Sequence, residues 1–149
     1  MKHPKTIAVL LGLTFAAGAA LAHDDAYLDT QKAPNGGQLR MAGPYHYELV
    51  VAKDGRDIKA NPVVVYVTDH AGQKVPTAGA AGTATILAGK QKAMAELKPD
   101  GDNRMKGFAQ YAPAPDMKVV VSIALAGKQP EQARFTPAVA VAQGSGHKH

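Results

Sequence analysis

Residues 45–51 read Tyr-His-Tyr-Glu-Leu-Val-Val, and this segment alternates between two kinds of side chain. In an extended strand, successive side chains point to opposite faces. One face carries the larger apolar side chains, namely Tyr45, Tyr47, Leu49 and Val51. The other face carries His46, Glu48 and Val50. Such a pattern is typical of an antiparallel sheet that packs one face on a core. We therefore expect His46 and Glu48 to be solvent-exposed.

The rest of the chain repeats short extended segments separated by turn signals such as Asp69-His70-Ala71-Gly72. The further predicted strands are Pro62–Thr68, Thr83–Ala88, Lys92–Leu97, Arg104–Tyr111, Met117–Leu125 and Gln132–Thr136. About seven short strands with regular turns predict an all-β fold, an immunoglobulin-like antiparallel β-sandwich. We expect its core to pair two sets of side chains, Val119, Val121, Ile123 and Leu125 with Tyr47, Leu49 and Val51.

Residues 1–22 have the pattern of a cleaved signal peptide, formed as a helix before removal. Lys2 and Lys5 precede an uncharged apolar run from residue 6 to residue 22, which closes with Ala20-Leu21-Ala22. Small residues at these positions suit a signal peptidase. The chain turns acidic immediately afterwards, unlike the flank of a membrane anchor. We predict a soluble, exported, periplasmic protein with no membrane insertion after signal cleavage.

The remaining chain divides into three predicted parts. Residues 23–38 are polar and rich in turn-forming residues, which indicates a flexible lead-in. Residues 39–136 form the predicted β-sandwich domain. Residues 137–149 end in Gly-Ser-Gly-His-Lys-His and are predicted to be a disordered, His-containing tail.

Composition excludes several function classes. The chain has 149 residues, of which 46% are hydrophobic, and it has no cysteine. Disulfide scaffolds, thiol nucleophiles and iron–sulfur sites are therefore excluded. Removing Lys2 and Lys5 lowers the net charge from +5 to +3, and the basic residues are scattered, so we expect no nucleic-acid binding. No nucleophile or phosphate-loop motif is complete, and we predict that the protein is not an enzyme.

Metal binding is the chemistry for which the sequence offers the most suitable side chains. His46 and Glu48 share one strand face, and Asp69 and His70 would approach them if the next strand pairs alongside. His23 would become the new amino terminus, where its amine and imidazole could together chelate Cu(II). Imidazole, carboxylate and thioether ligands without thiolate suit copper, silver or zinc. The site therefore predicts a copper or zinc ion and no organic cofactor.

Each of these features also has an ordinary structural explanation. A His–Glu pair on a solvent-exposed strand face commonly has no function. Asp69 and His70 lie in a turn, which an Asp at that position commonly stabilises. His147 and His149 form a tail motif that binds metals weakly and with little specificity.

Several segments together resemble a known family. They are Pro34-Asn35-Gly36-Gly37, Tyr45–Val50, Val63–His70, Gly79–Ile86 and Ala133-Arg134-Phe135. This order is similar to small exported proteins that accompany bacterial heavy-metal efflux systems, and to the β-domain of periplasmic adaptor (membrane-fusion) proteins of those pumps. The resemblance covers roughly residues 33–136. It implies a heavy-metal efflux complex as partner and carries over His46, Glu48, Asp69 and His70. Relatives typically have His-Gly-Gly where this chain has Asn35-Gly36-Gly37.

Three functions follow from these observations. The first is a periplasmic accessory protein that binds a transition-metal cation in connection with heavy-metal efflux or resistance. The second is a metal-free β-sandwich interaction module of the cell envelope, which docks a partner through an exposed strand edge. The third and most distant is a metal-dependent redox enzyme built on His23.

Overall fold

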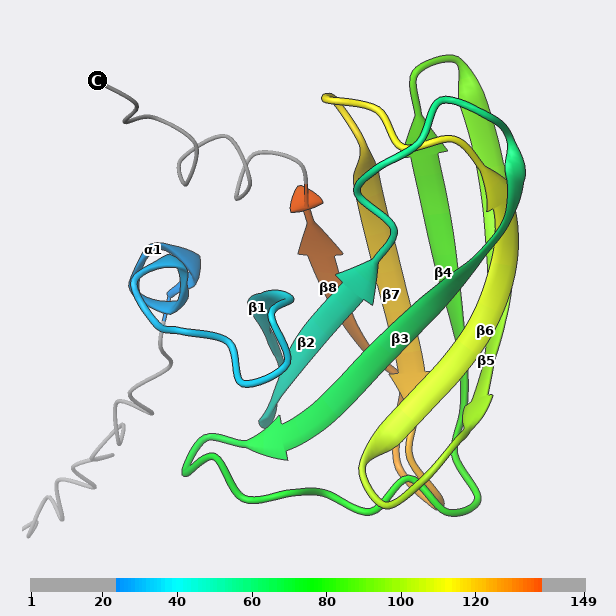
Figure 1. Ribbon diagram of the computed structural model, residues 1–149. Helices are drawn as coiled ribbons and strands as arrows, with labels where there is room; N and C mark the ends of the chain where they lie inside the picture. Colours follow the sequence, from blue (N-terminus) through cyan, green and yellow to red (C-terminus); the bar gives the residue numbers. More distant parts are fainter. Residues whose placement is uncertain (1–23, 138–149) are drawn as a thin grey trace, which may run out of the picture.

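A computed structural model describes residues 24–137 of the protein. Antiparallel strands dominate this part of the chain, which also contains one short helix (Figure 1). The elements in chain order are α1 (Asp25–Asp29), β1 (Gln38–Ala42), β2 (Tyr45–Val51), β3 (Lys59–Asp69), β4 (Ala81–Ala88), β5 (Gln91–Pro99), β6 (Arg104–Tyr111), β7 (Lys118–Ala124) and β8 (Glu131–Phe135). The predicted all-β antiparallel class is confirmed for the described residues, with eight strands in place of about seven.

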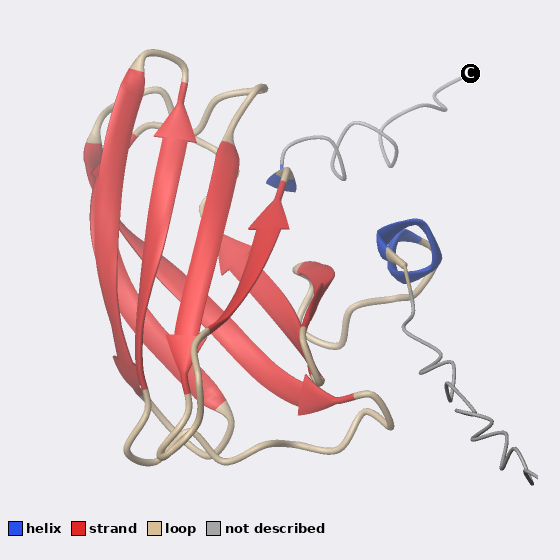
Figure 2. Cartoon of the chain, turned by 180° about the vertical axis from the view of Figure 1, so that it is seen from behind, coloured by secondary structure: helices blue, strands red, loops and turns tan. Residues whose placement is uncertain are grey.

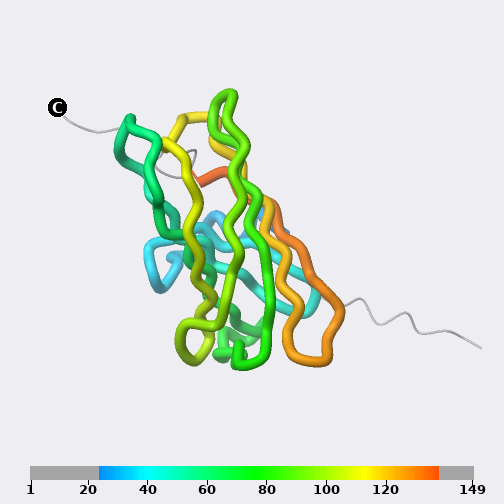
Figure 3. The backbone as a smooth tube through the Cα atoms, turned by 90° about the vertical axis from the view of Figure 1, so that its right-hand side faces the viewer, coloured from blue at the N-terminus to red at the C-terminus, as the bar shows by residue number. Residues whose placement is uncertain are grey.

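The strands form one hydrogen-bonded series in the order β1-β2-β3-β6-β5-β4-β7-β8. The sheet curls so strongly that β1–β3 and β6 face β4, β7 and β8 across a common interior (Figures 1 and 2). Strand β5 pairs with both β4 and β6 and thereby joins the two halves. Seen from the side, β4, β5 and β6 run next to one another along the sheet (Figure 3).

The core lies between these two halves, and the predicted inward residues are in it. Tyr47 and Leu49 of β2 are at most 1% exposed. The remaining predicted core residues are also buried, namely Val51, Val119, Val121, Ile123 and Leu125. Strand β3 adds Val63, Val65 and Val67, each fully buried. The period-two pattern therefore identified the inner face correctly, because only that face can remove β-branched and aromatic side chains from water.

The two end strands, β1 and β8, approach each other and nearly close the sheet. The Gln38 side-chain oxygen at the start of β1 accepts a hydrogen bond of 2.8 Å from the backbone N–H of Thr136, just after β8. The Tyr47 hydroxyl lies 3.4 Å from both the Ile123 and Glu131 carbonyl oxygens, so it also connects β2 to β7 and β8. These contacts connect the β1–β2 end of the sheet to the β7–β8 end.

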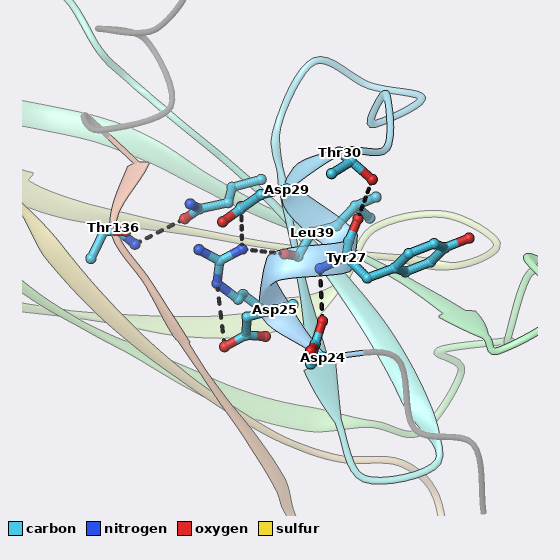
Figure 4. Close-up of polar contacts among 9 residues, drawn as sticks. Asp24, Asp25, Tyr27, Asp29, Thr30, Leu39 and Thr136 are labelled. Atoms are coloured by element: carbon cyan, nitrogen blue, oxygen red, sulfur yellow. Dashed lines mark hydrogen bonds and ion pairs between the residues drawn. The ribbon is translucent and has the colours of Figure 1, made fainter.

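The segment predicted to be a flexible lead-in, residues 23–38, is folded from residue 24 onward. Asp24 caps α1 by accepting a 2.8 Å hydrogen bond from the Tyr27 N–H. Leu28 is only 3% exposed. The buried Arg40 of β1 donates a 2.7 Å hydrogen bond to Asp29 and lies 3.7 Å from Asp25, which ties α1 to the sheet (Figure 4). The predicted signal helix lies outside the described residues, as does the predicted tail from residue 138 onward.

Tyr47 should make the fold sensitive to alkali. Burial, followed by the nearby charge of Glu131, raises the pKa of its phenol well above the ordinary tyrosine value of about 10. The unfolded chain therefore releases this proton first, and the free energy of unfolding falls as the pH rises above about 10.

Urea unfolding of Tyr47→Phe across this alkaline range should show a flatter decline than the parent chain. Tyr27→Phe is the matched control, because Tyr27 is 45% exposed. Identical slopes for the parent and Tyr47→Phe would contradict this explanation. Burial also raises the pKa of Tyr111, so some decline should remain in the variant.

Candidate functional site

Both faces of β2 are buried, which corrects the prediction that His46 and Glu48 are solvent-exposed. His46 is 7% exposed and Glu48 is 3% exposed. The cause is the folded segment before β1: side chains of α1 and of the following loop, including Leu28 and Pro34, cover the outer face of β1–β3. Sequence periodicity reports on the two faces of one strand and gives no information about a distant segment that returns to cover it.

A pocket of about 560 Å³ lies between this covering segment and the outer face of the sheet. Its floor carries the predicted site residues His46 and Glu48 of β2, together with Tyr66 and Thr68 of β3. His70, just after β3, also lines it. Lys32 and Lys74 add positive charge at the pocket wall.

The Glu48 carboxylate is a structural anchor. Oε1 accepts hydrogen bonds from the backbone N–H groups of Asn35 (2.7 Å) and Gly37 (3.0 Å), and Oε2 accepts one of 2.9 Å from the Asn35 side chain. Gly37 is required here because a Cβ atom would lie 2.3 Å from the Leu49 carbonyl oxygen. Three donors thus stabilise a buried charge that would otherwise be costly. Asn35 therefore holds Glu48 through both its backbone N–H and its side-chain amide.

Asp69 also has a local structural task. Its Oδ1 accepts hydrogen bonds of 2.9 Å from the backbone N–H groups of both Ala71 and Gln73. This arrangement stabilises the turn after β3, as the sequence indicated for an Asp at that position. The carboxylate is therefore engaged with its own turn, while the turn carries His70 toward β2.

His46 and His70 come together across the paired strands. Strand β2 pairs with β3 so that His46 faces Thr68, two residues before His70. The two imidazole rings stack with their centroids 4.9 Å apart and their planes 23° from parallel. His70 Nε2 lies 3.3 Å from the Gly43 carbonyl oxygen in the β1–β2 turn. The strand pairing thus brings His46 and His70 of the predicted ligand set into direct contact.

The other predicted metal ligands form no larger ligand group in the described residues or lie outside them. Within residues 24–137, no group of three or more His, Cys, Asp or Glu side chains is placed to hold a metal ion. His23 lies outside the described residues, as do His147 and His149. The redox function proposed for His23 therefore stays a prediction.

Sequence reasoning missed the contribution of the segment before β1. Tyr27, Leu28 and Asn35 all line the pocket. A signal was present in Asp24, an N-cap residue followed by Asp25 in the first helical turn, although a five-residue helix is too short to show apolar periodicity.

Comparisons with known proteins give no assignment. No family model matches the chain, no curated protein matches it, and no solved structure matches it. Among the helices of the described part, none is long and apolar enough to cross a membrane.

Replacing Glu48 should loosen the segment that covers the pocket. In Glu48→Gln, one carboxylate oxygen becomes an NH2 group, which faces N–H donors and cannot accept their hydrogen bonds. The remaining hydrogen bonds are no longer to a charged group, so the free energy of unfolding should fall by about 1.5–3 kcal/mol. Urea unfolding measures this difference.

Glu96→Gln is the matched control for that experiment. The Glu96 side chain is 77% exposed and lies 4.0 Å from Lys98, so its replacement should change stability by less than about 0.5 kcal/mol. Equal unfolding midpoints for the two variants would show that the Glu48 contacts do not stabilise the fold.

Proposed function

We propose that this protein binds a transition-metal cation, copper-like or zinc, through His46 and His70. The stacked pair of imidazoles from neighbouring strands carries this proposal. Histidine nitrogen is a preferred ligand for both ions. The adjoining pocket gives room for further ligands, such as water or a small anion attracted by Lys32 and Lys74.

The contact between His70 and Gly43 supports this role. A ring N–H directed from Nε2 to the Gly43 carbonyl fixes the tautomer and leaves the lone pair on Nδ1. Metal-binding histidines commonly donate their second ring N–H to a carbonyl in this way. His46, fixed on a strand and 93% buried, adds a ring that needs little ordering before a cation binds.

The cellular setting follows from the resemblance to proteins of bacterial heavy-metal efflux systems. We propose a periplasmic accessory protein, exported with a cleaved signal peptide and working beside an efflux complex. In this interpretation the curled sheet is an immunoglobulin-like sandwich. The metal-free alternative, docking through a strand edge, receives less support because β1 and β8 approach each other and are connected through Gln38 and Thr136.

Calorimetric titration with a competing chelator tests metal binding directly. The exported chain is purified without a tag, and His23, His147 and His149 are replaced by Ala to remove the other histidines. This background should bind at least one of Cu(I), Ag(I), Cu(II) and Zn(II) in equimolar amount and more tightly than about micromolar, corresponding to roughly 8 kcal/mol.

Adding His70→Ala to the same background should abolish this binding. His70 is solvent-exposed, so its replacement leaves the core untouched. His46→Ala should have the same effect, with circular dichroism to verify the fold because His46 is buried. Unchanged affinity after loss of His70, or no binding by the background chain, would overturn the proposal and favour a metal-free interaction module.

A further inference from the structure

We propose that Met41 is a third ligand at the His46–His70 pair, and that the site therefore selects a soft monovalent cation, Cu(I) or Ag(I). This inference rests on the proposed function and specifies its cation. It depends on the register of three neighbouring strands, which brings a thioether and two imidazoles to the same end of the outer face.

The β-sheet register places Met41 beside His46. Met41 of β1 is the direct cross-strand partner of His46 of β2. Directly opposed residues in an antiparallel pair have Cβ atoms about 4.5–5.5 Å apart and point to the same face. The unbranched Met side chain, with its three rotatable bonds, can cover such a distance easily.

The face on which Met41 lies is fixed by its neighbours along β1. Leu39, two residues earlier, is paired with Glu48, and both line the outer pocket. Residues two apart on a strand share a face. Met41 is thus on the outer face with His46, while the intervening Arg40 is buried and pairs with Tyr47.

His70 reaches the same place from β3. Its Nε2 lies against the Gly43 carbonyl, in the turn that directly follows β1, while its ring stacks on His46. His70 therefore extends across the end of β2 toward β1. Met41 lies only two residues before Gly43, so the strand register places all three residues at the same end of the β1–β2 hairpin.

The ligand chemistry of this trio differs from that of a zinc site. A thioether is a soft ligand that suits Cu(I), whereas Zn(II) is held by imidazole, thiolate or carboxylate. The two nearby carboxylates, Glu48 and Asp69, accept backbone N–H groups and belong to the surrounding structure. Two imidazoles and one thioether form a neutral ligand set, which favours a singly charged cation over a divalent one because less charge is left uncompensated in a partly buried site.

Silver titration of Met41→Leu tests the thioether. Ag(I) is the probe because it resembles Cu(I) in softness and needs no reductant. In the chain lacking His23, His147 and His149, Met41→Leu should weaken Ag(I) binding by about tenfold to a hundredfold, since even supporting contacts of a metal site contribute that much. Zn(II) affinity should stay unchanged.

Met94→Leu is the matched control. Met94 lies on β5 and is 63% exposed, so its loss should leave Ag(I) affinity unaltered. In chains labelled at the methionine methyl groups, nuclear magnetic resonance adds a second readout. Silver should shift the Met41 methyl signal, and the Met94 signal should stay in place.

The outcomes separate this inference from the proposed function. If the background chain binds neither Ag(I) nor Zn(II), both proposals are wrong. If His70→Ala abolishes Ag(I) binding while Met41→Leu and the Met41 methyl signal show no effect, the histidine pair stands and the thioether ligand is wrong. Equal weakening of Ag(I) and Zn(II) by Met41→Leu would indicate a packing effect and would also overturn the thioether assignment.

Discussion

The buried carboxylate of Glu48 is the interaction on which the outer half of this structure depends. Its three hydrogen bonds hold Asn35 and Gly37 against β2 and bring the preceding segment back over the sheet. Without that cover, the face that carries His46 would be open to water. The same contacts form the pocket and bury His46. Glu48, which the sequence predicted to be a metal ligand, therefore acts by positioning the residues around the site.

The strand pattern could be predicted from sequence because burial of one sheet face imposes a period of two. That constraint identifies Tyr47 and Leu49 as core residues and locates seven of the eight strands. Strand β1 escaped detection because its buried positions include Gln38 and Arg40, whose polar groups are satisfied by Thr136 and by the aspartates of α1. Polar residues at the buried positions of a strand remove the alternating apolar pattern from which a strand is predicted. Helix α1 was missed for a related reason, since a single turn depends on its contacts with the sheet.

The candidate site shows the same division between local and distant information. The approach of His70 to His46 followed from an antiparallel pairing of consecutive strands, which sequence reasoning could anticipate. Of the two carboxylates, only Asp69 has a role that could be predicted from the sequence. Asp69 stabilises a turn within four residues of itself, a signal that was visible, whereas Glu48 anchors donors 11 and 13 positions away. Contacts of that range depend on the path of the chain.

The proximity of Gln38 and Thr136 has a mechanical consequence. Strands β1 and β8 lie near the two ends of the described part of the chain, and this contact joins them, so tension applied along the chain would load it early. Strands β1 and β8 would peel away before the inner strands, because each pairs with a single neighbour while the inner strands have neighbours on both sides. Loss of β1 would open the pocket, since α1 is tied to β1 through Arg40. His46 thus lies on the strand next to one of the two edge strands that would separate first under force.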